Sequence, residues 1–311
     1  MTSSRTKEIP RYDDALHGGA VDEIQTGEYN YKYRLLNGIV MPPYVTPERY
    51  AISRAVQTRP GDVCYTSYPK SGSTWLANII YLILNRGKTP DKVTLRSQLF
   101  WMESGWTYIR SPEEADAAPS PRIFKSHMPY PMSLGGGPAE NPDCRFVYIA
   151  RNPKDVAVSY YHFESRKAWS GDYDGPWEHW LEMFLAGRVQ RGDWFDHVLG
   201  WWRHRELPNV LFITYEDLVL DFGGTLGTLL EFLDFDYPDE VISAICEKSA
   251  FDYMKRAEFT NHQQISEMEG FFRSGRIGSW KARFSEAQSR EFDRIYAQRM
   301  AGTGLDFVFE S

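Results

Sequence analysis

The segment that most constrains the fold is residues 65–75, which read YTSYPKSGSTW. An apolar run ends there in a glycine-containing loop, and this loop opens directly into a helical pattern. Backbone N–H groups at the start of a helix have no intrahelical partners, and the helix dipole adds positive potential, so an anion binds there readily. Lys70 adds a full charge, and Ser71, Ser73 and Thr74 add hydroxyl donors. The segment therefore predicts a P-loop-like phosphate-binding turn between a strand and a helix.

The spacing of this loop is not that of a Walker A motif. The sequence contains no Gly-x-x-x-x-Gly-Lys-Ser/Thr, and Lys70 precedes Gly72 instead of following it. Hydrolysis of a nucleoside triphosphate is therefore not the first expectation. Trp75 comes directly after the loop, where its indole could stack on a purine base. The alternative interpretation is an ordinary strand-to-helix turn with a core tryptophan.

A second segment, residues 147–159 (VYIARNPKDVAVS), repeats this design. Arg151 follows an apolar strand, and a helix is entered at Pro153 with Asp155 in its first turn. Because arginine binds phosphate in a bidentate manner, Arg151 and Ser159 could meet one phosphate group. Taken alone, an Arg-Asn-Pro turn is more often part of a structural salt bridge.

Two further segments carry cations. Residues 271–281 (FFRSGRIGSWK) are basic and rich in glycine, so they could close over an anion or form a solvated surface loop. In residues 123–129 (IFKSHMP), Lys125 and His127 end another apolar run. A lone histidine is usually structural, but this one follows a lysine by two residues.

The order of the apolar segments predicts the fold class. Strand-like segments lie at 62–68, 121–126, 144–150 and 209–215. Helical patterns lie at 74–86, 153–166, 177–186, 193–205, 222–234, 238–247 and 285–300. This alternation predicts an α/β single domain with a mostly parallel central sheet flanked by helices. Lys70, Lys125, Arg151 and Tyr215 lie at or just after the expected strand ends, where such sheets bind ligands.

The N-terminus and the overall charge limit the remaining possibilities. Residues 1–25 are polar, so we expect a flexible N-terminal segment before one domain at residues 26–311. The net charge of −7 argues against binding of nucleic acid. The sequence has no run of about eighteen apolar residues and no signal-peptide pattern, which predicts a cytoplasmic protein without membrane contact. Three cysteines without metal-ligand spacing are expected to be reduced, buried thiols: Cys64, Cys144 and Cys246.

Together, these segments resemble the cytosolic sulfotransferases, which transfer a sulfuryl group from 3′-phosphoadenosine 5′-phosphosulfate (PAPS) to a hydroxyl or amine. Residues 68–75 are similar to that family's 5′-phosphosulfate loop, and residues 148–160 to its 3′-phosphate element. Residues 123–129 are similar to the segment that carries the catalytic base, and residues 271–281 to the C-terminal loop. The resemblance extends from about residue 40 to 300 and implies PAPS as the donor and PAP as the product.

The resemblance also implies residue roles. His127 is the expected general base, because imidazole titrates near neutral pH. Lys70 is expected at the leaving phosphate oxygen and Lys125 at the sulfuryl oxygens, without a metal ion. The residues implied for cofactor binding are Lys70, Ser71, Gly72, Ser73, Thr74, Trp75, Arg151, Ser159, Tyr215, Ser249, Phe251, Arg273, Ser274 and Gly275. Trp75 and Phe251 would enclose the adenine, although an aromatic residue at 251 could equally be part of the core.

The sequence departs from the family pattern in two places. Ser274 and Ser279 replace a lysine and an aspartate of the C-terminal loop, so one anion contact is expected to be weakened, unless Arg276 replaces it. The dimerisation motif, read at residues 281–290 (KARFSEAQSR), lacks its valine and its glutamate. A monomer and a homodimer are therefore both expected alternatives.

The acceptor is expected to be a small hydrophobic or aromatic alcohol or amine. Aromatic residues make up 15% of the chain, and a subset could line an acceptor pocket: Phe100, Trp101, Trp106, Tyr108 and Tyr130. Residues 135–137 and 261–272 could gate this pocket. Two other functions remain open. A P-loop phosphotransferase would require ATP and Mg²⁺, and a non-catalytic nucleotide-binding protein would not need both Lys125 and His127.

Overall fold

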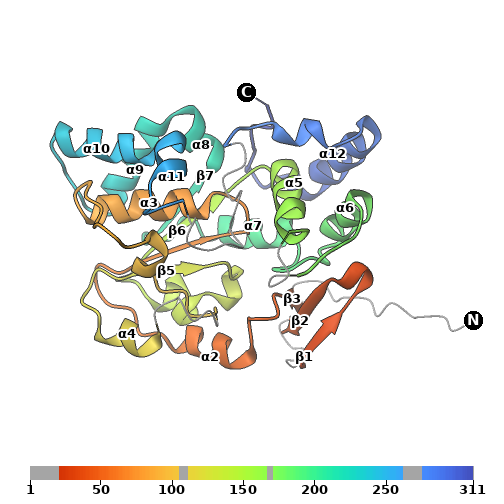
Figure 1. Ribbon diagram of the computed structural model, residues 1–311, viewed down its shortest axis with the longest axis horizontal. Coiled ribbons are helices and arrows are strands. Elements are labelled where there is room, and N and C mark those ends of the chain that lie inside the picture. Colours follow the sequence, from red (N-terminus) through yellow and green to blue (C-terminus); the bar gives the residue numbers. More distant parts are fainter. Residues whose placement is uncertain (1–20, 105–110, 167–170, 262–274, 311) are drawn as a thin grey trace, which may run out of the picture.

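A four-stranded parallel sheet forms the centre of the computed structural model, which describes residues 21–104, 111–166, 171–261 and 275–310 (Figure 1). The strand order is β5-β4-β6-β7. The strands are β4 (Val63–Ser67), β5 (Ile123–Ser126), β6 (Arg145–Ala150) and β7 (Val210–Thr214). All three strand pairs are parallel, and each strand lies inside a segment that the sequence predicts as a strand. The expected α/β fold with a parallel central sheet is confirmed.

Helices cover both faces of this sheet. The helices that follow the central strands are α3 (Ser73–Leu84), α5 (Pro153–Glu164), α6 (Trp177–Leu185), α7 (Trp194–Trp202), α8 (Tyr215–Leu220), α9 (Phe222–Phe232), α10 (Asp239–Ser249), α11 (Phe251–Arg256) and α12 (Glu286–Met300). Two more helices, α2 (Pro47–Ala55) and α4 (Pro112–Ala117), lie at the bottom of the view in Figure 1. Short 3₁₀ turns lie at η1 (Glu28–Asn30), η2 (Leu95–Gln98), η3 (Tyr130–Met132), η4 (Leu134–Gly136), η5 (Pro138–Glu140) and η7 (Ser279–Ala282).

The alternation of side chains along the strands explains the two helical layers. Tyr65 and Val147 face a buried cluster that includes residues of α3, α9 and α10. Their neighbours Cys64 and Tyr148 face the opposite cluster, formed with residues of α5, α6 and α7. Every residue of β4 is buried, as is typical of a parallel strand covered on both faces.

A second, antiparallel sheet was not predicted from the sequence. It consists of β1 (Val21–Thr26), β2 (Lys32–Leu36) and β3 (Ile39–Met41). Strand β1 begins within the N-terminal segment that was expected to be flexible, while residues 1–20 lie outside the described part of the chain. The first four residues of β2 are all half-buried, so buried and exposed positions do not alternate along it.

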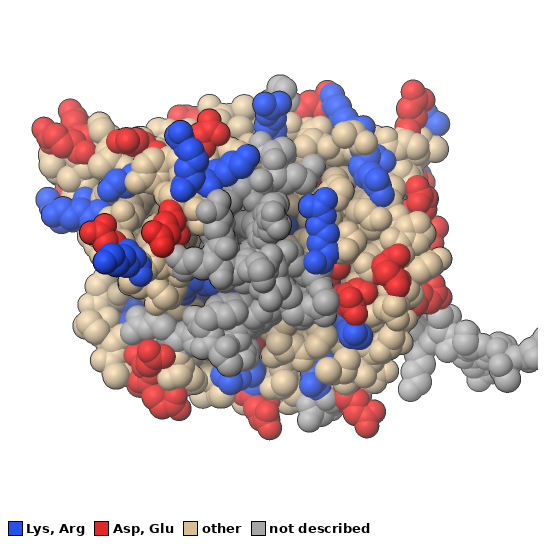
Figure 2. All heavy atoms as spheres, viewed as in Figure 1, with Lys and Arg blue, Asp and Glu red and all other residues tan. Residues whose placement is uncertain are grey.

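The surface visible in Figure 2 carries acidic and basic side chains side by side. None of the described helices is long and apolar enough to cross a membrane. The described cysteines are all free thiols, but Cys246 is only half-buried, unlike the expectation for it.

Candidate active site

The predicted phosphate-binding loop lies between β4 and α3. Gly72 precedes the first residue of α3, Ser73, and has a φ of 98°. A Cβ atom at Gly72 would lie 2.8 Å from Cδ2 of Tyr215, so the ring of Tyr215 packs directly on the loop and only glycine fits there. Ser71 is fully buried, and its hydroxyl has no hydrogen-bond partner within the described part of the chain. No side chain caps the N-terminus of α3, so the N–H groups of its first turn are not paired by a capping side chain.

Lys70 belongs to the same loop and has a φ of 70°, which is uncommon for a residue with a side chain. Its Nζ atom lies 4.3 Å from the ring centroid of Phe163 on α5. The lysine therefore extends from the loop toward the helix that begins after Arg151.

His127 follows β5 and is held in one tautomer. Its Nδ1 atom lies 2.8 Å from the carbonyl oxygen of Ser67 at the end of β4. Because a carbonyl oxygen only accepts hydrogen bonds, Nδ1 must carry the proton and Nε2 keeps its lone pair. Burial, followed by the positive charges of Lys125 and Arg191, lowers the pKa of His127 well below its usual value. The imidazole is therefore neutral at neutral pH, with an unprotonated Nε2.

A second layer of residues fixes the backbone of His127. Its N–H group donates to Oε1 of Glu103 at 2.9 Å, and its carbonyl oxygen accepts from Nε2 of His197 at 3.1 Å. The hydroxyl of Tyr148 in turn donates to Nδ1 of His197 at 2.8 Å. Neither His197 nor Glu103 was predicted from the sequence as part of the site. No local pattern could have revealed Glu103, because it lies 24 residues from His127 in the chain.

Lys125 lies on β5 with Trp101 at one side, its Nζ atom 4.0 Å from the indole ring. The ring of Trp101 also contacts that of His127, with centroids 5.6 Å apart. Burial, followed by the nearby charge of Arg96, lowers the pKa of Lys125 well below its usual value. Of the aromatic residues expected around the acceptor, Trp101 thus lies at the site.

The other expected acceptor residues lie elsewhere or are not described. Phe100 packs in the core against Phe124, with ring centroids 5.5 Å apart. Tyr130 stacks on His204 at 3.5 Å. Trp106 and Tyr108 lie outside the described residues, and so does almost all of the segment 261–272.

Arg151 follows β6, as expected for a residue on the rim of the sheet. Its Nη2 atom donates to Oδ2 of Asp155 at 3.2 Å and to the carbonyl oxygen of Arg276 at 3.0 Å. Its guanidinium carbon lies 4.2 Å from the ring centroid of Tyr215. The buried Nε atom of Arg151 has no hydrogen-bond partner among the described residues. Ser159 is half-buried on α5, the helix that starts two residues after Arg151.

Asp155 ties the C-terminal loop to this region. Its carboxylate accepts from the backbone N–H groups of Gly278 at 3.0 Å and Trp280 at 2.9 Å, and from the hydroxyl of Ser279 at 2.8 Å. Ser279, one of the departures from the family pattern, therefore donates to a buried carboxylate. The side chain of Arg276 is exposed, and its carbonyl oxygen makes the contact with Arg151.

The remaining expected binding residues are described only in part. Gly275 has a φ of 63°, and a Cβ atom there would lie 2.5 Å from Cδ2 of Phe251, so the Phe251 ring packs against the start of the C-terminal loop. Arg273 and Ser274 lie outside the described residues. In the described ranges, no group of three His, Cys, Asp or Glu side chains could hold a metal ion.

Trp75 and Ser249, both expected near the adenine from the family resemblance, are in direct contact. Nε1 of Trp75 donates to the carbonyl oxygen of Ser249 at 2.8 Å. Trp75 also stacks on Phe222, with ring centroids 6.0 Å apart and an angle of 14° between the planes. Sequence reasoning missed Phe222, which covers part of the indole. The buried hydroxyl of Ser249 has no hydrogen-bond partner in the described part of the chain.

Comparison with known proteins assigns the family. The model of the family described as "Sulfotransferase domain" matches residues 60–304. Sulfotransferase 1B1 of Mus musculus is 37% identical over 261 residues, which cover 81% of this chain and 86% of that protein. Sulfotransferase 1C2 of Homo sapiens is 33% identical over 290 residues, covering 90% and 96%.

A solved structure agrees with this assignment. The mouse sulfotransferase SULT7A1, crystallised in complex with PAP, superimposes with a TM-score of 0.72 at 29% identity and covers 90% of this chain and 94% of its own. Retinol dehydratase, in complex with retinol and PAP, has the same fold, with a TM-score of 0.75 at 22% identity over 97% of this chain and 98% of its own. The resemblance predicted from the sequence is confirmed, and the chain belongs to the sulfotransferase family.

Proposed function

We propose that this enzyme transfers a sulfuryl group from PAPS to a hydroxyl or amine of a small hydrophobic or aromatic acceptor, with His127 as the general base. The observation that carries the proposal is the tautomer of His127. Since Nδ1 donates to the carbonyl oxygen of Ser67, the basic Nε2 atom is available beside Lys125 and Trp101.

The reaction requires an acceptor oxygen or nitrogen that loses its proton. His127 would take that proton on Nε2, and the acceptor atom would form a bond to sulfur while the bond from sulfur to the bridging phosphate oxygen breaks. The electron pair of that bond remains on the phosphate of PAP. Lys125 would balance negative charge on the sulfuryl oxygens and Lys70 the charge on the leaving phosphate. Such charge stabilisation by fixed groups is usually a large part of catalysis.

Several of the described residues support this choice of nucleotide. Among the buried side-chain atoms without a hydrogen-bond partner in the described chain, three belong to residues expected to bind the cofactor, namely the hydroxyls of Ser71 and Ser249 and the Nε atom of Arg151. Buried polar groups normally have partners, and a bound nucleotide would supply partners for these three. Arg151, with Ser159 and the C-terminal loop, would bind the 3′-phosphate, and the N-terminus of α3 the 5′-phosphosulfate. Trp75 and Phe251 would contact the adenine, and Tyr215 supports both phosphate sites.

Two further observations support the proposed class of acceptor and a cytosolic location. Trp101 gives the acceptor side of the site an aromatic wall next to His127, which suits a phenol or another apolar alcohol or amine. The three free cysteines suit a reducing compartment such as the cytosol.

A thermal-shift titration tests the cofactor class first. PAP at about a hundred times its dissociation constant should stabilise the protein by about 2.7 kcal/mol. Adenosine 5′-monophosphate should stabilise it much less, because it lacks the 3′-phosphate. Stabilisation by ATP with Mg²⁺ but not by PAP would contradict the proposal and favour a phosphotransferase. Transfer of labelled sulfate from PAPS to a panel of phenols, steroids and amines would then identify the acceptor class.

A further inference from the structure

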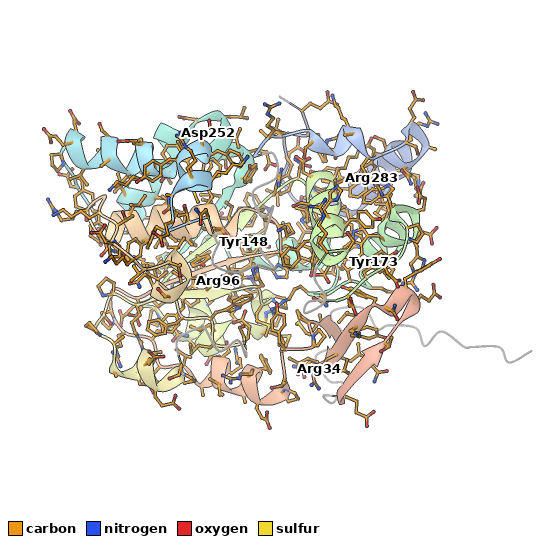
Figure 3. All side chains as sticks on the ribbon, in the orientation of Figure 1. Arg34, Arg96, Tyr148, Tyr173, Asp252 and Arg283 are labelled. Carbon is orange, nitrogen blue, oxygen red and sulfur yellow. The ribbon has the colours of Figure 1, made fainter. Side chains whose placement is uncertain are left out.

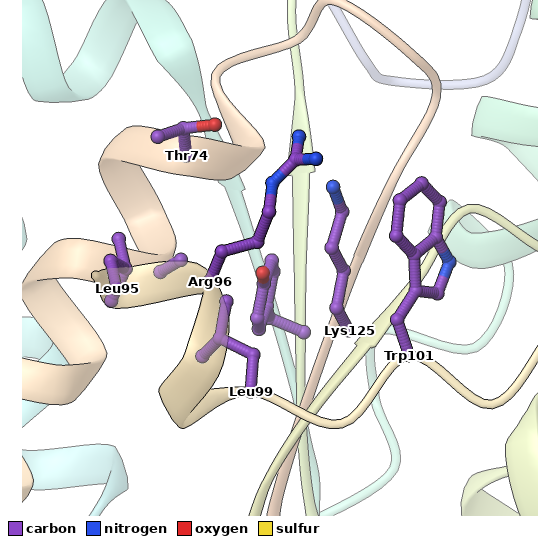
Figure 4. Close-up of a pocket in the computed structure, with 8 residues that line it drawn as sticks. Thr74, Leu95, Arg96, Leu99, Trp101 and Lys125 are labelled. Atoms are coloured by element: carbon purple, nitrogen blue, oxygen red, sulfur yellow. The ribbon is translucent and has the colours of Figure 1, made fainter. Parts of the chain in front are cut away.

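A small pocket of about 20 Å³ lies between α3, η2 and β5, and two cations line it (Figure 4). Its lining includes Thr74 from the first turn of α3, Arg96 from η2, and Lys125 from β5. The pocket is small, so we consider it as a site for one end of a larger ligand.

The order of the side chains in Figure 4 indicates which end that is. The guanidinium of Arg96 lies between Thr74 and the ammonium group of Lys125, and Trp101 lies on the far side of Lys125. Trp101 adjoins His127, the proposed base. Arg96 is therefore on the side of Lys125 that faces the phosphate-binding helix, away from the proposed acceptor side. In Figure 3, Arg96 lies in the middle of the molecule.

The charges around Lys125 favour an anion at this position. Its cationic neighbours are Arg96, Arg191 and Lys70, and Glu103 is the anion among them. Like charges that share a pocket repel one another, and an anion held between them removes this cost. The planar fork of an arginine suits an oxyanion better than a lysine does, because it donates two parallel hydrogen bonds.

We infer that Arg96 is a second cationic contact for the sulfuryl end of the 5′-phosphosulfate, sharing the charge on its oxygens with Lys125. The inference rests on the proposed use of PAPS as the donor. Arg96 neither donates nor accepts the transferred proton. Its role is to hold the sulfuryl oxygens while the bond from sulfur to the acceptor atom forms and the bond to the bridging oxygen breaks.

The test compares R96Q and R96K with R203Q, a control that removes an exposed arginine at the end of α7. PAP lacks the sulfuryl group, so its affinity, measured by calorimetry, should change less than twofold in R96Q. The kcat/KM for PAPS should fall about 10–100-fold, the range expected for loss of one charge-assisted hydrogen bond. R96K should lose less, and R203Q should match the wild type.

A pH profile adds a readout that a purely structural role would not move. Removing the charge of Arg96 should raise the pKa of Lys125, so the loss of activity at high pH should move to higher pH in R96Q. An unchanged kcat/KM, or equal losses of PAP affinity and kcat/KM, would overturn the inference.

Labelling of the wild-type protein decides the question even if R96Q does not fold. Phenylglyoxal modifies arginine, and mass spectrometry reports the rate at Arg96. PAPS without acceptor should protect Arg96 at least tenfold more than PAP does, and equal protection would refute the contact. A wild-type protein that binds neither nucleotide would instead refute the proposed function itself.

Discussion

His127 shows how a single residue acquires a role from a distant part of the chain. The contact that fixes its tautomer comes from Ser67, 60 residues earlier. The sequence could place both residues at strand ends, because β4 and β5 are readable from their apolar runs. It could not show that β4 and β5 are neighbours, which is what brings the carbonyl oxygen of Ser67 to Nδ1.

Replacing His127 should separate chemistry from binding. In His127→Ala, turnover should fall about 10²–10⁴-fold, the usual contribution of a general base, while PAP affinity stays close to that of the wild type. Steady-state kinetics and calorimetry with PAP measure the two effects. His179→Ala is the matched control, since His179 pairs with Glu28 away from the site. If His127→Ala lost PAP affinity as much as turnover, His127 would be structural.

The raised pKa of Glu216 should make the free energy of unfolding depend on pH. Burial raises the pKa of Glu216 from 4.5 to about 7, although the side chain accepts from both the N–H and the amide of Asn152. The folded protein therefore retains a proton that the unfolded chain releases near pH 4.5. The stabilisation is complete below pH 4.5 and is lost as the pH rises to about 7, a change of about 3 kcal/mol.

Urea denaturation between pH 4.5 and 8 would measure this contribution. The free energy of unfolding of the wild type should decline with pH relative to that of Glu216→Gln, which keeps an acceptor oxygen but cannot ionise. Parallel curves for the two proteins would show that Glu216 titrates in its ordinary range.

At the scale of elements, the sequence predicted the parts that depend on local pattern. The four parallel strands and most of the helices that follow them were predicted because their apolar patterns are contiguous, whereas the short helices α8 and α11 were not predicted. Lys70, Lys125 and Arg151 were placed at the rim for the same reason. Glu103, Arg96 and Phe222 were missed, since each reaches the site through a contact between distant elements.

The attachment of the C-terminal loop to α5 can be tested at Asp155. The Asp155→Asn variant replaces one acceptor oxygen by an NH₂ group, which cannot accept hydrogen bonds. Some of the hydrogen bonds from Gly278, Ser279 and Trp280 to this side chain should therefore be lost. Loss of such a buried, charged hub should cost about 2–4 kcal/mol of stability and weaken PAP binding about 10–100-fold. Urea denaturation and calorimetry measure these changes.

Ser279→Ala is the matched control for this element. It removes one donor and leaves the two backbone contacts, so stability should fall by about 1 kcal/mol with little change in PAP affinity. A tenfold loss of PAP affinity in Ser279→Ala would mean that the serine serves the cofactor directly and not only Asp155.

At the scale of the whole molecule, the carboxyl and amino ends of the parallel strands are expected to serve function and stability, respectively. The proposed site lies at the carboxyl ends of the strands, after Ser67, Ser126 and Ala150. At the amino ends, Asp62 and Arg122 directly precede β4 and β5 and form a buried ion pair. Asp62 also accepts from the backbone N–H of Arg122 at 2.9 Å. This pair is far from the chemistry, so it should govern stability alone.

The Asp62→Asn variant tests that division. It leaves the guanidinium of Arg122 buried without its counter-charge, which should cost about 3–5 kcal/mol in urea denaturation. The dissociation constant for PAP, measured on the folded protein well below its melting temperature, should remain within twofold of the wild type. Removing both charges in Asp62→Leu with Arg122→Met should restore part of the stability, because no unpaired charge then remains buried. If Asp62→Asn lost as much free energy of PAP binding as free energy of unfolding, the ion pair at the amino ends of the strands would be coupled to the proposed site at their carboxyl ends.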